Sequence, residues 1–142
     1  VKDLVSTVSL PKTFLSMGGI NVGDAMVGED LKTVADGQTE NRVNEIFAQI
    51  SESRVGRCVR TEDYLYSVYA PNKNGGEYVG SDLYEEDFLY DIKNDPHELN
   101  NLVRDERYKE IRAELADKLR KHMVEAGEKD PKIISARECI TN

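Results

Sequence analysis

The side chains of this sequence that could act as nucleophiles are few and lie apart from any base. Covalent hydrolysis requires an activated Ser, Cys or Thr beside a base and an orienting group. Cys58 lies in the strand-like segment GRCVRT, and Cys139 lies in the C-terminal tail. Neither stands beside a histidine or in the kind of glycine-rich turn that exposes a nucleophile. We therefore predict that Cys58 is a structural thiol and that the chain contains no catalytic residue.

Residues that could bind a metal ion or a cofactor also lack the required spacing. The two histidines, His97 and His122, are not spaced to share a metal ion. Acidic residues gather between Glu77 and Asp95, where they outnumber the single Lys93. This acidic cluster consists of Asp82, Glu85, Glu86, Asp87 and Asp91. It lacks the Asp, Gly and Glu positions of a calcium-binding loop. We predict no metal or cofactor site in this chain, and we interpret the cluster as a solvated rim around a strand.

The composition fits a folded globular protein of the size of one ordinary domain. The chain has 142 residues, of which 39% are hydrophobic and 32% are charged. Its formal net charge is −8, from 27 acidic and 19 basic residues, so nucleic acid and anionic membrane surfaces should be repelled. No apolar run approaches the ~20 residues that span a bilayer. We therefore expect neither a nucleic-acid nor a membrane partner, and the sparse cysteines indicate no compartment.

The N-terminal part of the sequence predicts one helix followed by a loop. The first apolar side chains have mixed helical spacing up to Gly18 and Gly19, which predict the end of a helix. Pro11 fits the first turn of the regular portion, where a missing amide hydrogen is tolerated. From Asn21 to Arg42 the apolar pattern fades and glycines recur, so this stretch is predicted to be a connecting loop. Because Val1 stands inside what looks like an element, we expect a fragment whose helix packs against a missing part.

Four short segments rich in β-branched and aromatic residues predict strands. They are Val43–Ile50, Arg57–Thr61, Tyr64–Tyr69 and Phe88–Ile92. Between the last two, residues 72–76 (NKNGG) are the strongest turn signal in the sequence, because Asn and Gly adopt positive φ at little cost. No helix is expected directly after this turn, so its glycines do not predict a phosphate-binding loop. Together the segments predict an antiparallel sheet of about four strands.

A short helical turn and a longer helix are predicted after the sheet. In DPHEL, Asp95 fits an N-cap, Pro96 fits the first helical position, and Glu98 fits the third position of a capping box. A longer helix is predicted from about Asp105 to Ala126, with apolar residues recurring every three or four positions. These apolar residues are Tyr108, Ile111, Leu115, Leu119 and Met123. Such a stripe suits docking on a sheet, so the predicted fold class is α+β, a small antiparallel sheet with a long C-terminal helix packed on it. The residues after Pro131 are predicted to form a tail.

Several strings in this sequence are similar, in order, to strings found in sulfatases of the alkaline-phosphatase superfamily. LPKTFLSMGGI resembles a helix that lies late in these enzymes, with matches at Leu10, Pro11, Thr13, Leu15, Gly19 and Ile20. The segment that follows it matches at Met26, Gly28 and Leu31. GRCVRTEDYLYSVYAP resembles two of the family's strands, with matches at Arg57, Val59, Arg60, Thr61, Tyr64 and Tyr66. FLYDIKNDPHELNNL is the most specific string, with matches at Leu89, Tyr90, Asp91, Asp95, Pro96, Glu98, Asn101 and Leu102.

The resemblance covers nearly the whole chain and leaves only Lys32 to Arg42 unmatched. Three positions depart from the usual family pattern: Ser9, Lys12 and Leu65 stand where Asp, Pro and Lys are common. These departures bear on the subfamily more than on membership of the family.

The resemblance implies a division of the chain and the chemistry of its parent enzyme. Residues 1–42 would be the end of the large catalytic domain, including its helix and a connecting loop, and residues 43–142 would be a C-terminal subdomain. The parent enzyme would use a formylglycine, made from the Cys or Ser of a C-x-P-S-R or S-x-P-S-R string, and a divalent cation, usually calcium. In the family all catalytic residues precede the matched segment, and Cys58 does not fit the nucleophile string. No catalytic, cofactor-binding or metal-binding residue is therefore carried over.

Three possible functions remain open on the sequence. The first is the C-terminal fragment of a sulfatase that supports the missing N-terminal catalytic domain, its partner, with the NKNGG loop and the acidic cluster as the only candidates for a cleft wall. The alternatives are a free-standing interaction domain and the tail of a related phosphodiesterase or phosphonate hydrolase. Without the catalytic domain, apolar surface around Leu4, Val8, Phe14 and Leu15 should be exposed and should favour self-association.

Overall fold

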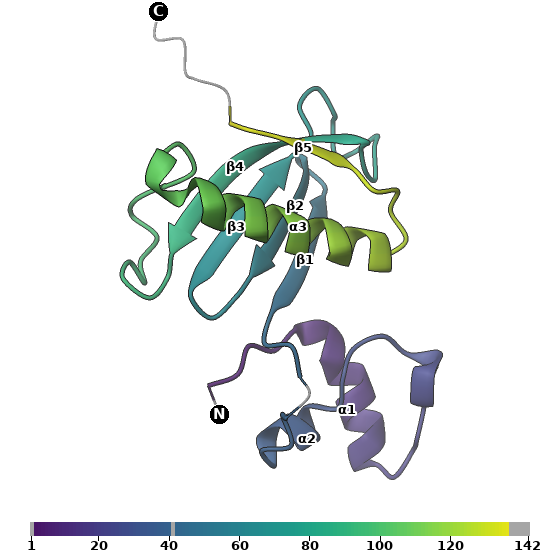
Figure 1. Ribbon diagram of the computed structural model, residues 1–142. Helices are drawn as coiled ribbons and strands as arrows, with labels where there is room; N and C mark the ends of the chain where they lie inside the picture. The colour runs from purple at the N-terminus through teal and green to yellow at the C-terminus, as the bar shows by residue number, and fades with distance from the viewer. Residues whose placement is uncertain (1, 41, 137–142) are drawn as a thin grey trace, which may run out of the picture. The chain divides into compact units, whose positions relative to one another are not determined.

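The computed structural model describes residues 2–40 and 42–136 of the chain. These residues form two compact units, residues 1–46 and residues 47–142, which are described separately below. The first unit is helical and the second contains the sheet and the long helix (Figure 1). No helix within the described residues is long and apolar enough to cross a bilayer.

The helical unit is built around α1 (Leu10–Met17), which follows the 3-10 turn η1 (Thr7–Ser9). Pro11 lies in the first turn of α1, as the sequence predicts. The helix ends where Gly19 adopts φ 80° and the amide of Ile20 donates to the carbonyl of Leu15 at 2.9 Å. This bond closes the last turn of the helix, and glycine adopts the left-handed conformation without a steric cost. Of the residues predicted to expose apolar surface, Val8 and Phe14 are exposed, whereas Leu4 and Leu15 are half-buried.

The prediction of a plain loop from residue 21 to residue 42 is wrong, because this stretch contains two short helical segments. The 3-10 turn η2 (Gly23–Ala25) comes first, and α2 (Leu31–Ala35) follows it. The side chain of Asp30 caps α2 by accepting a hydrogen bond from the amide of Lys32 at 2.9 Å. A helix of five residues is too short to show an apolar period, so the cap was its main sequence signal.

The second unit contains a five-stranded sheet with the spatial order β1-β2-β3-β4-β5. The strands are β1 (Ile46–Ser51), β2 (Val55–Arg60), β3 (Tyr64–Tyr69), β4 (Leu83–Asp91) and β5 (Lys132–Ile134). β2, β3 and β4 pair in antiparallel fashion, whereas β5 pairs with β4 in parallel. The predicted α+β class is confirmed, and the sheet gains a fifth strand from the segment that the sequence assigned to a tail.

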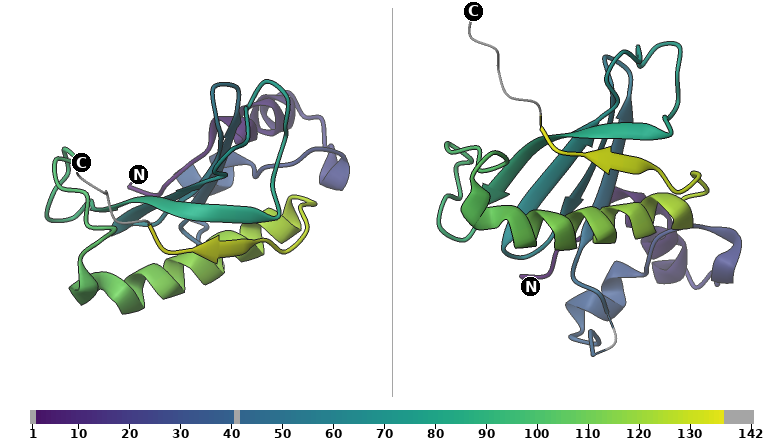
Figure 2. Two further views of the ribbon diagram at one scale, coloured as in Figure 1. Left: turned by 90° about the horizontal axis from the view of Figure 1, so that it is seen from above. Right: turned by 45° about the horizontal axis from the view of Figure 1, so that its top comes forward.

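The long helix α3 (Lys109–Glu125) lies across one face of this sheet (Figure 2). It follows the 3-10 turn η3 (Glu106–Tyr108), which begins where the Asp105 side chain accepts a hydrogen bond from the amide of Arg107. The residues buried between α3 and the sheet form one core: Val55, Val59, Tyr66, Val68, Ala70, Tyr84, Leu89, Val103, Leu115, Leu119 and Met123. The predicted stripe on α3 therefore faces the sheet, as its spacing indicated.

The DPHEL segment forms a turn in which the amide of Glu98 donates to the carbonyl of Asp95 at 3.0 Å, and the predicted helical turn with its capping box does not form. Glu98 has φ 54°, a left-handed conformation that cannot continue a right-handed helix. Asp95 still accepts backbone hydrogen bonds, but from the amide of Asn100 at 2.8 Å and from that of Leu99, as the cap of a turn. The same side chains favour helix caps and tight turns, so the local sequence could not distinguish the two.

Candidate functional site

Cys58 is the only described cysteine, and its surroundings disfavour reactivity. It lies in β2 opposite Ser67 of β3 and is half-buried. Burial raises the pKa of the Cys58 thiol, an effect that a hydrogen bond with the backbone of Ala48 only partly offsets. A raised pKa lowers the fraction of thiolate, which is the nucleophilic form. Cys139 lies outside the described residues.

The two histidines take up unrelated positions. His97 is exposed in the turn after β4. His122 lies in α3, where its ring stacks on Phe47 at 5.9 Å between centroids, and its Nδ1 lies 3.5 Å from a carboxylate oxygen of Glu125. In residues 2–40 and 42–136, no group of three or more His, Cys, Asp or Glu side chains is arranged to hold a metal ion.

The acidic cluster is not the solvated rim that the sequence predicted, because three of its members are buried. Glu85, Glu86 and Asp91 lie in β4 with at most 7% of their surface exposed, whereas Asp82 is exposed. The strand β4 lies between β3 and β5, so it is not an edge of the sheet. Buried carboxylates require partners to offset the loss of hydration.

Glu86 finds such partners in Tyr66 and Arg112. One carboxylate oxygen of Glu86 accepts a hydrogen bond from the Tyr66 hydroxyl at 3.2 Å, and the other lies 3.4 Å from Nε of Arg112. Arg112 also donates to the carbonyl of Asp105 at 2.8 Å. Burial, with the nearby charge of Glu86, raises the pKa of Tyr66 well above its usual value, so the hydroxyl remains a donor. These contacts of Glu86 with Tyr66 and Arg112 join α3 to β3 and β4.

Sequence reasoning missed Arg112, although a signal was present. Position 112 follows Tyr108 by four residues and precedes Leu115 by three, so it lies on the apolar stripe of the helix. A charged residue on a buried stripe requires a buried counter-charge, and the acidic residues of β4 were the available candidates.

A second buried cluster surrounds Arg57, which is 3% exposed. Its Nε donates to a carboxylate oxygen of Glu128 at 2.6 Å, and its two other nitrogens donate to the carbonyls of Val79 at 2.6 Å and Gly56 at 2.7 Å. The Tyr84 hydroxyl donates to the second oxygen of Glu128 at 3.1 Å, and burial raises the pKa of Tyr84 to about 12. This cluster joins β2 to the loop after β3 and to the segment after α3.

Asn101 and Asp91, both in the string FLYDIKNDPHELNNL, hold the nearby backbone in place through hydrogen bonds. The Asn101 carbonyl oxygen accepts hydrogen bonds from the amides of Leu89 at 3.0 Å and Val103 at 3.1 Å, and its amide nitrogen donates to the carbonyl of Asp87 at 3.1 Å. Asp91 accepts hydrogen bonds from the backbone and side-chain nitrogens of Asn94 at 3.0 and 2.8 Å. These polar groups are therefore engaged in holding the chain after β4 against the sheet.

The NKNGG segment forms part of the long loop between β3 and β4, as predicted. Asn72 has φ 62°, and Gly75 is buried against the turn between β1 and β2. A Cβ atom on Gly75 would lie 2.6 Å from the carbonyl oxygen of Glu52, so only glycine fits there. At the surface of the loop, the Lys73 ammonium lies 3.9 Å above the Tyr78 ring, which is partly exposed.

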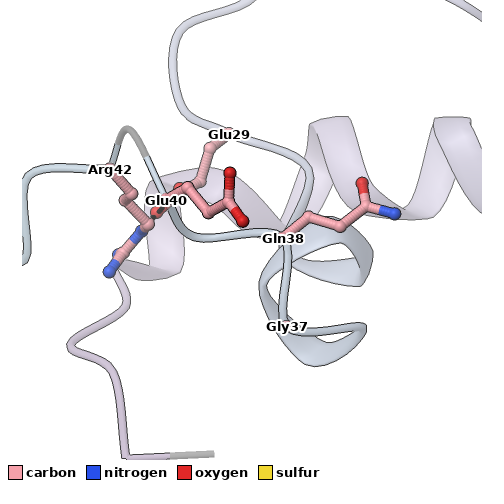
Figure 3. A pocket seen from close by; sticks show the side chains of 5 residues that line it. All are labelled: Glu29, Gly37, Gln38, Glu40 and Arg42. Atoms are coloured by element: carbon pink, nitrogen blue, oxygen red, sulfur yellow. Dashed lines mark hydrogen bonds and ion pairs between the residues drawn. The ribbon is translucent and has the colours of Figure 1, made fainter.

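The helical unit has its own cavity of about 580 Å³, lined by Glu29, Gly37, Gln38, Glu40 and Arg42 (Figure 3). Arg42 donates to both carboxylate oxygens of Glu29, at 2.8 and 2.7 Å, and also bonds the carbonyl of Leu4 and the side chain of Asn44. Gln38 extends away from Arg42, so the polar groups do not converge on one point. Arg42 thus ties three segments of the unit together.

Comparison with known proteins identifies the class to which this fold and these motifs belong. A family model described as "N-sulphoglucosamine sulphohydrolase, C-terminal" matches residues 1–125. This chain therefore belongs to the family of sulfatase C-terminal regions that this model describes. A search of the curated proteins finds no match.

Solved sulfatase structures share the fold. The 2-O GAG sulfatase BT1596 is 26% identical with a TM-score of 0.69, over 90% of this chain and 27% of that one. BT4656, solved with its substrate D-glucosamine-2-N,6-O-disulfate, is 21% identical with a TM-score of 0.67, over 87% and 24%. A candidate sulfatase from Bacteroides thetaiotaomicron VPI-5482 is 24% identical with a TM-score of 0.65, over 84% and 24%. The chain spans about a quarter of the length of each of these structures. The matches do not favour a free-standing interaction domain or the tail of a related phosphodiesterase or phosphonate hydrolase.

Proposed function

We propose that this chain is the C-terminal part of an enzyme that hydrolyses sulfate esters, in which it supports the catalytic domain without contributing a catalytic group. Residues 1–42 would then complete the catalytic domain, and residues 43–142 would form the C-terminal subdomain. Two findings support this assignment: the chain belongs to the C-terminal family, and it matches only about a quarter of the length of the solved sulfatases.

The observation that carries the proposal is the engagement of the motif residues inside the fold. Arg57, Asp91 and Asn101 belong to the strings that resemble sulfatases, and each directs its polar atoms to neighbouring backbone or side chains of this chain. Groups held in this way build a scaffold, and they are not presented together to a substrate. The presence of these three residues in the strings that resemble sulfatases is therefore accounted for by their role in folding.

The described residues do not fit the groups that the family uses for catalysis. A formylglycine must arise from an accessible Cys or Ser in its own string, whereas Cys58 is half-buried in a strand and is followed by Val59 and Arg60. A calcium ion prefers six to eight oxygen ligands, and the described carboxylates form no cluster that could hold one. We therefore assign both groups to the rest of the enzyme and derive no step through them here.

The reading frame upstream of Val1 tests the proposal. We expect it to encode a hydrolase domain with a C-x-P-S-R or S-x-P-S-R string. A start codon directly before Val1, with no hydrolase domain upstream, would contradict the proposal and would favour a free-standing interaction domain.

A further inference from the structure

The residues Asn74 and Gly75, in the long loop between β3 and β4, can react with each other. They form the only Asn-Gly pair in the sequence. The backbone nitrogen that follows an asparagine can attack the carbonyl carbon of the asparagine side chain. A following glycine hinders this attack least, because it has no Cβ atom. Asn74 is exposed, so the water that completes the reaction can reach it.

Ring closure between these two residues needs an unusual backbone conformation. The Cβ atom of Asn74 must eclipse the Gly75 nitrogen about the Cα–C bond, so ψ of Asn74 must turn to a sparsely populated value. In the fold, the carbonyl of Asn74 accepts hydrogen bonds from the amides of Glu77 at 3.1 Å and Tyr78 at 2.9 Å. These two bonds hold ψ of Asn74, and the rotation would break them.

The neighbours of Asn74 are held as well. Gly75 is buried against the turn between β1 and β2, where a Cβ atom on it would lie 2.6 Å from the carbonyl oxygen and 2.8 Å from the amide nitrogen of Glu52. The Oδ1 atom of the Asn74 side chain accepts a hydrogen bond from the amide of Gly76 at 3.0 Å. The nucleophilic nitrogen and the carbonyl carbon that it would attack are therefore both restrained while the loop is packed.

We infer that Asn74 and Gly75 form a self-modification site that the fold keeps inactive and that reacts when the loop leaves the β1–β2 turn. The Gly75 nitrogen bonds to Cγ of Asn74, and the side-chain amino group leaves with the Gly75 proton as ammonia. The product is a succinimide ring. Water then opens the ring at either carbonyl carbon and gives aspartate or isoaspartate, in which the main chain runs through Cγ.

The isoaspartate product should be unable to restore the native loop. Its main chain is one carbon longer before Gly75, where the packing leaves no room even for a Cβ atom. The aspartate product keeps the normal main chain and an oxygen that can accept from the amide of Gly76. Formation of isoaspartate would thus make a transient opening of this loop permanent.

The rate of deamidation at Asn74 tests the inference. Mass spectrometry follows it at mildly alkaline pH in the 142-residue chain, folded and in urea, and in a synthetic peptide of residues 69–82. In urea and in the peptide, we expect Asn74 to react and Asn72, which precedes Lys73, to stay intact. In the folded chain, the reaction at Asn74 should be about tenfold slower or more, because two backbone hydrogen bonds must break first. Equal rates in the folded chain and the peptide would overturn the inference.

A second comparison tests the effect of the longer main chain separately from that of the new charge. The chain is deamidated in urea, the isoaspartate form is isolated and returned to native buffer, and its urea unfolding is measured. Asn74→Asp is the matched control, because it carries the same charge on a normal main chain. We expect Asn74→Asp to unfold at nearly the same urea concentration as the unaltered chain, and the isoaspartate form to unfold at a lower one. Equal midpoints for Asn74→Asp and the isoaspartate form would show that the loop accommodates the extra carbon and would contradict the inference.

Discussion

Arg57 and Glu128 lie 71 positions apart in the sequence, and their side chains meet at 2.6 Å inside the sheet unit. Arg57 is contributed by β2, and Glu128 follows the end of α3. Their contact holds the segment that leads into β5 against the strand β2. The guanidinium group also bonds the carbonyl of Val79, which brings the long loop after β3 into the same cluster.

Removing one member of this buried pair should be costly. We expect Arg57→Ala to lower the free energy of unfolding by about 3 kcal/mol, because the carbonyls around Arg57 would lose their donor and the partly buried Glu128 would lose its main partner. Urea unfolding followed by circular dichroism measures the change. The matched control is Arg120→Ala, which breaks an exposed pair with Asp130 of the same 2.6 Å length and should cost less than about 1 kcal/mol. Equal costs for the two variants would contradict the role assigned to Arg57.

The long loop after β3 should reject a methyl group at Gly75 and tolerate one at the next residue, Gly76. We expect Gly75→Ala to destabilise the protein by about 1–3 kcal/mol, because the new Cβ would lie 2.6 Å from the carbonyl oxygen of Glu52. Gly76→Ala is the control, since the nearest atom to its Cβ would be 3.6 Å away. The same unfolding experiment measures both variants, and a neutral Gly75→Ala would show that the loop is not packed on the β1–β2 turn.

Asp105 should contribute to acid sensitivity. A side-chain hydrogen bond with Arg107, followed by the bond to the Arg107 amide, lowers the pKa of Asp105 from 3.8 to about 2. Since the pKa is depressed in the folded state, the stabilisation is complete above the unfolded pKa of about 4 and is lost as the pH falls toward 2. NMR titration of the Asp105 carboxyl carbon should give a midpoint near 2, and Arg107→Ala should raise it. A midpoint near 4 in the unaltered protein would be inconsistent with this bond.

The Cys58 thiol should react slowly. Burial raises its pKa, so little thiolate exists at neutral pH. In a Cys139→Ser variant, where Cys58 is the remaining thiol, we expect alkylation by iodoacetamide to be slow in the folded protein and to accelerate in urea. Equally fast labelling with and without urea would mean that the thiol is accessible and reactive in the native state.

The sequence predicted elements whose signals are long and periodic, and it failed where the signal was short or depended on distant contacts. The stripe from Tyr108 to Met123 extends over several helical turns, and it correctly placed α3 on the sheet. The strand β5 has only three residues and pairs in parallel with a strand far away in the sequence, so no local pattern could reveal it.

The acidic cluster shows why the interior charges were misjudged. Carboxylates are usually exposed, and the partners that bury Glu86 come from β3 and α3, which are remote in sequence. The Arg112 position on the helix stripe was the available clue. In DPHEL, Asp95 accepts backbone hydrogen bonds as a cap, but Glu98 does not complete a capping box, and its left-handed backbone directs the chain into a turn.

The central claim is that this chain supplies a scaffold for sulfate ester hydrolysis and none of its catalytic groups. The most direct test compares arylsulfate turnover by the complete enzyme and by the 142-residue chain at equal molar concentration, both with calcium. The claim predicts turnover by the complete enzyme and only background release by the chain. Turnover by the chain above background, in a preparation where Met123 remains protected from oxidation, would contradict it.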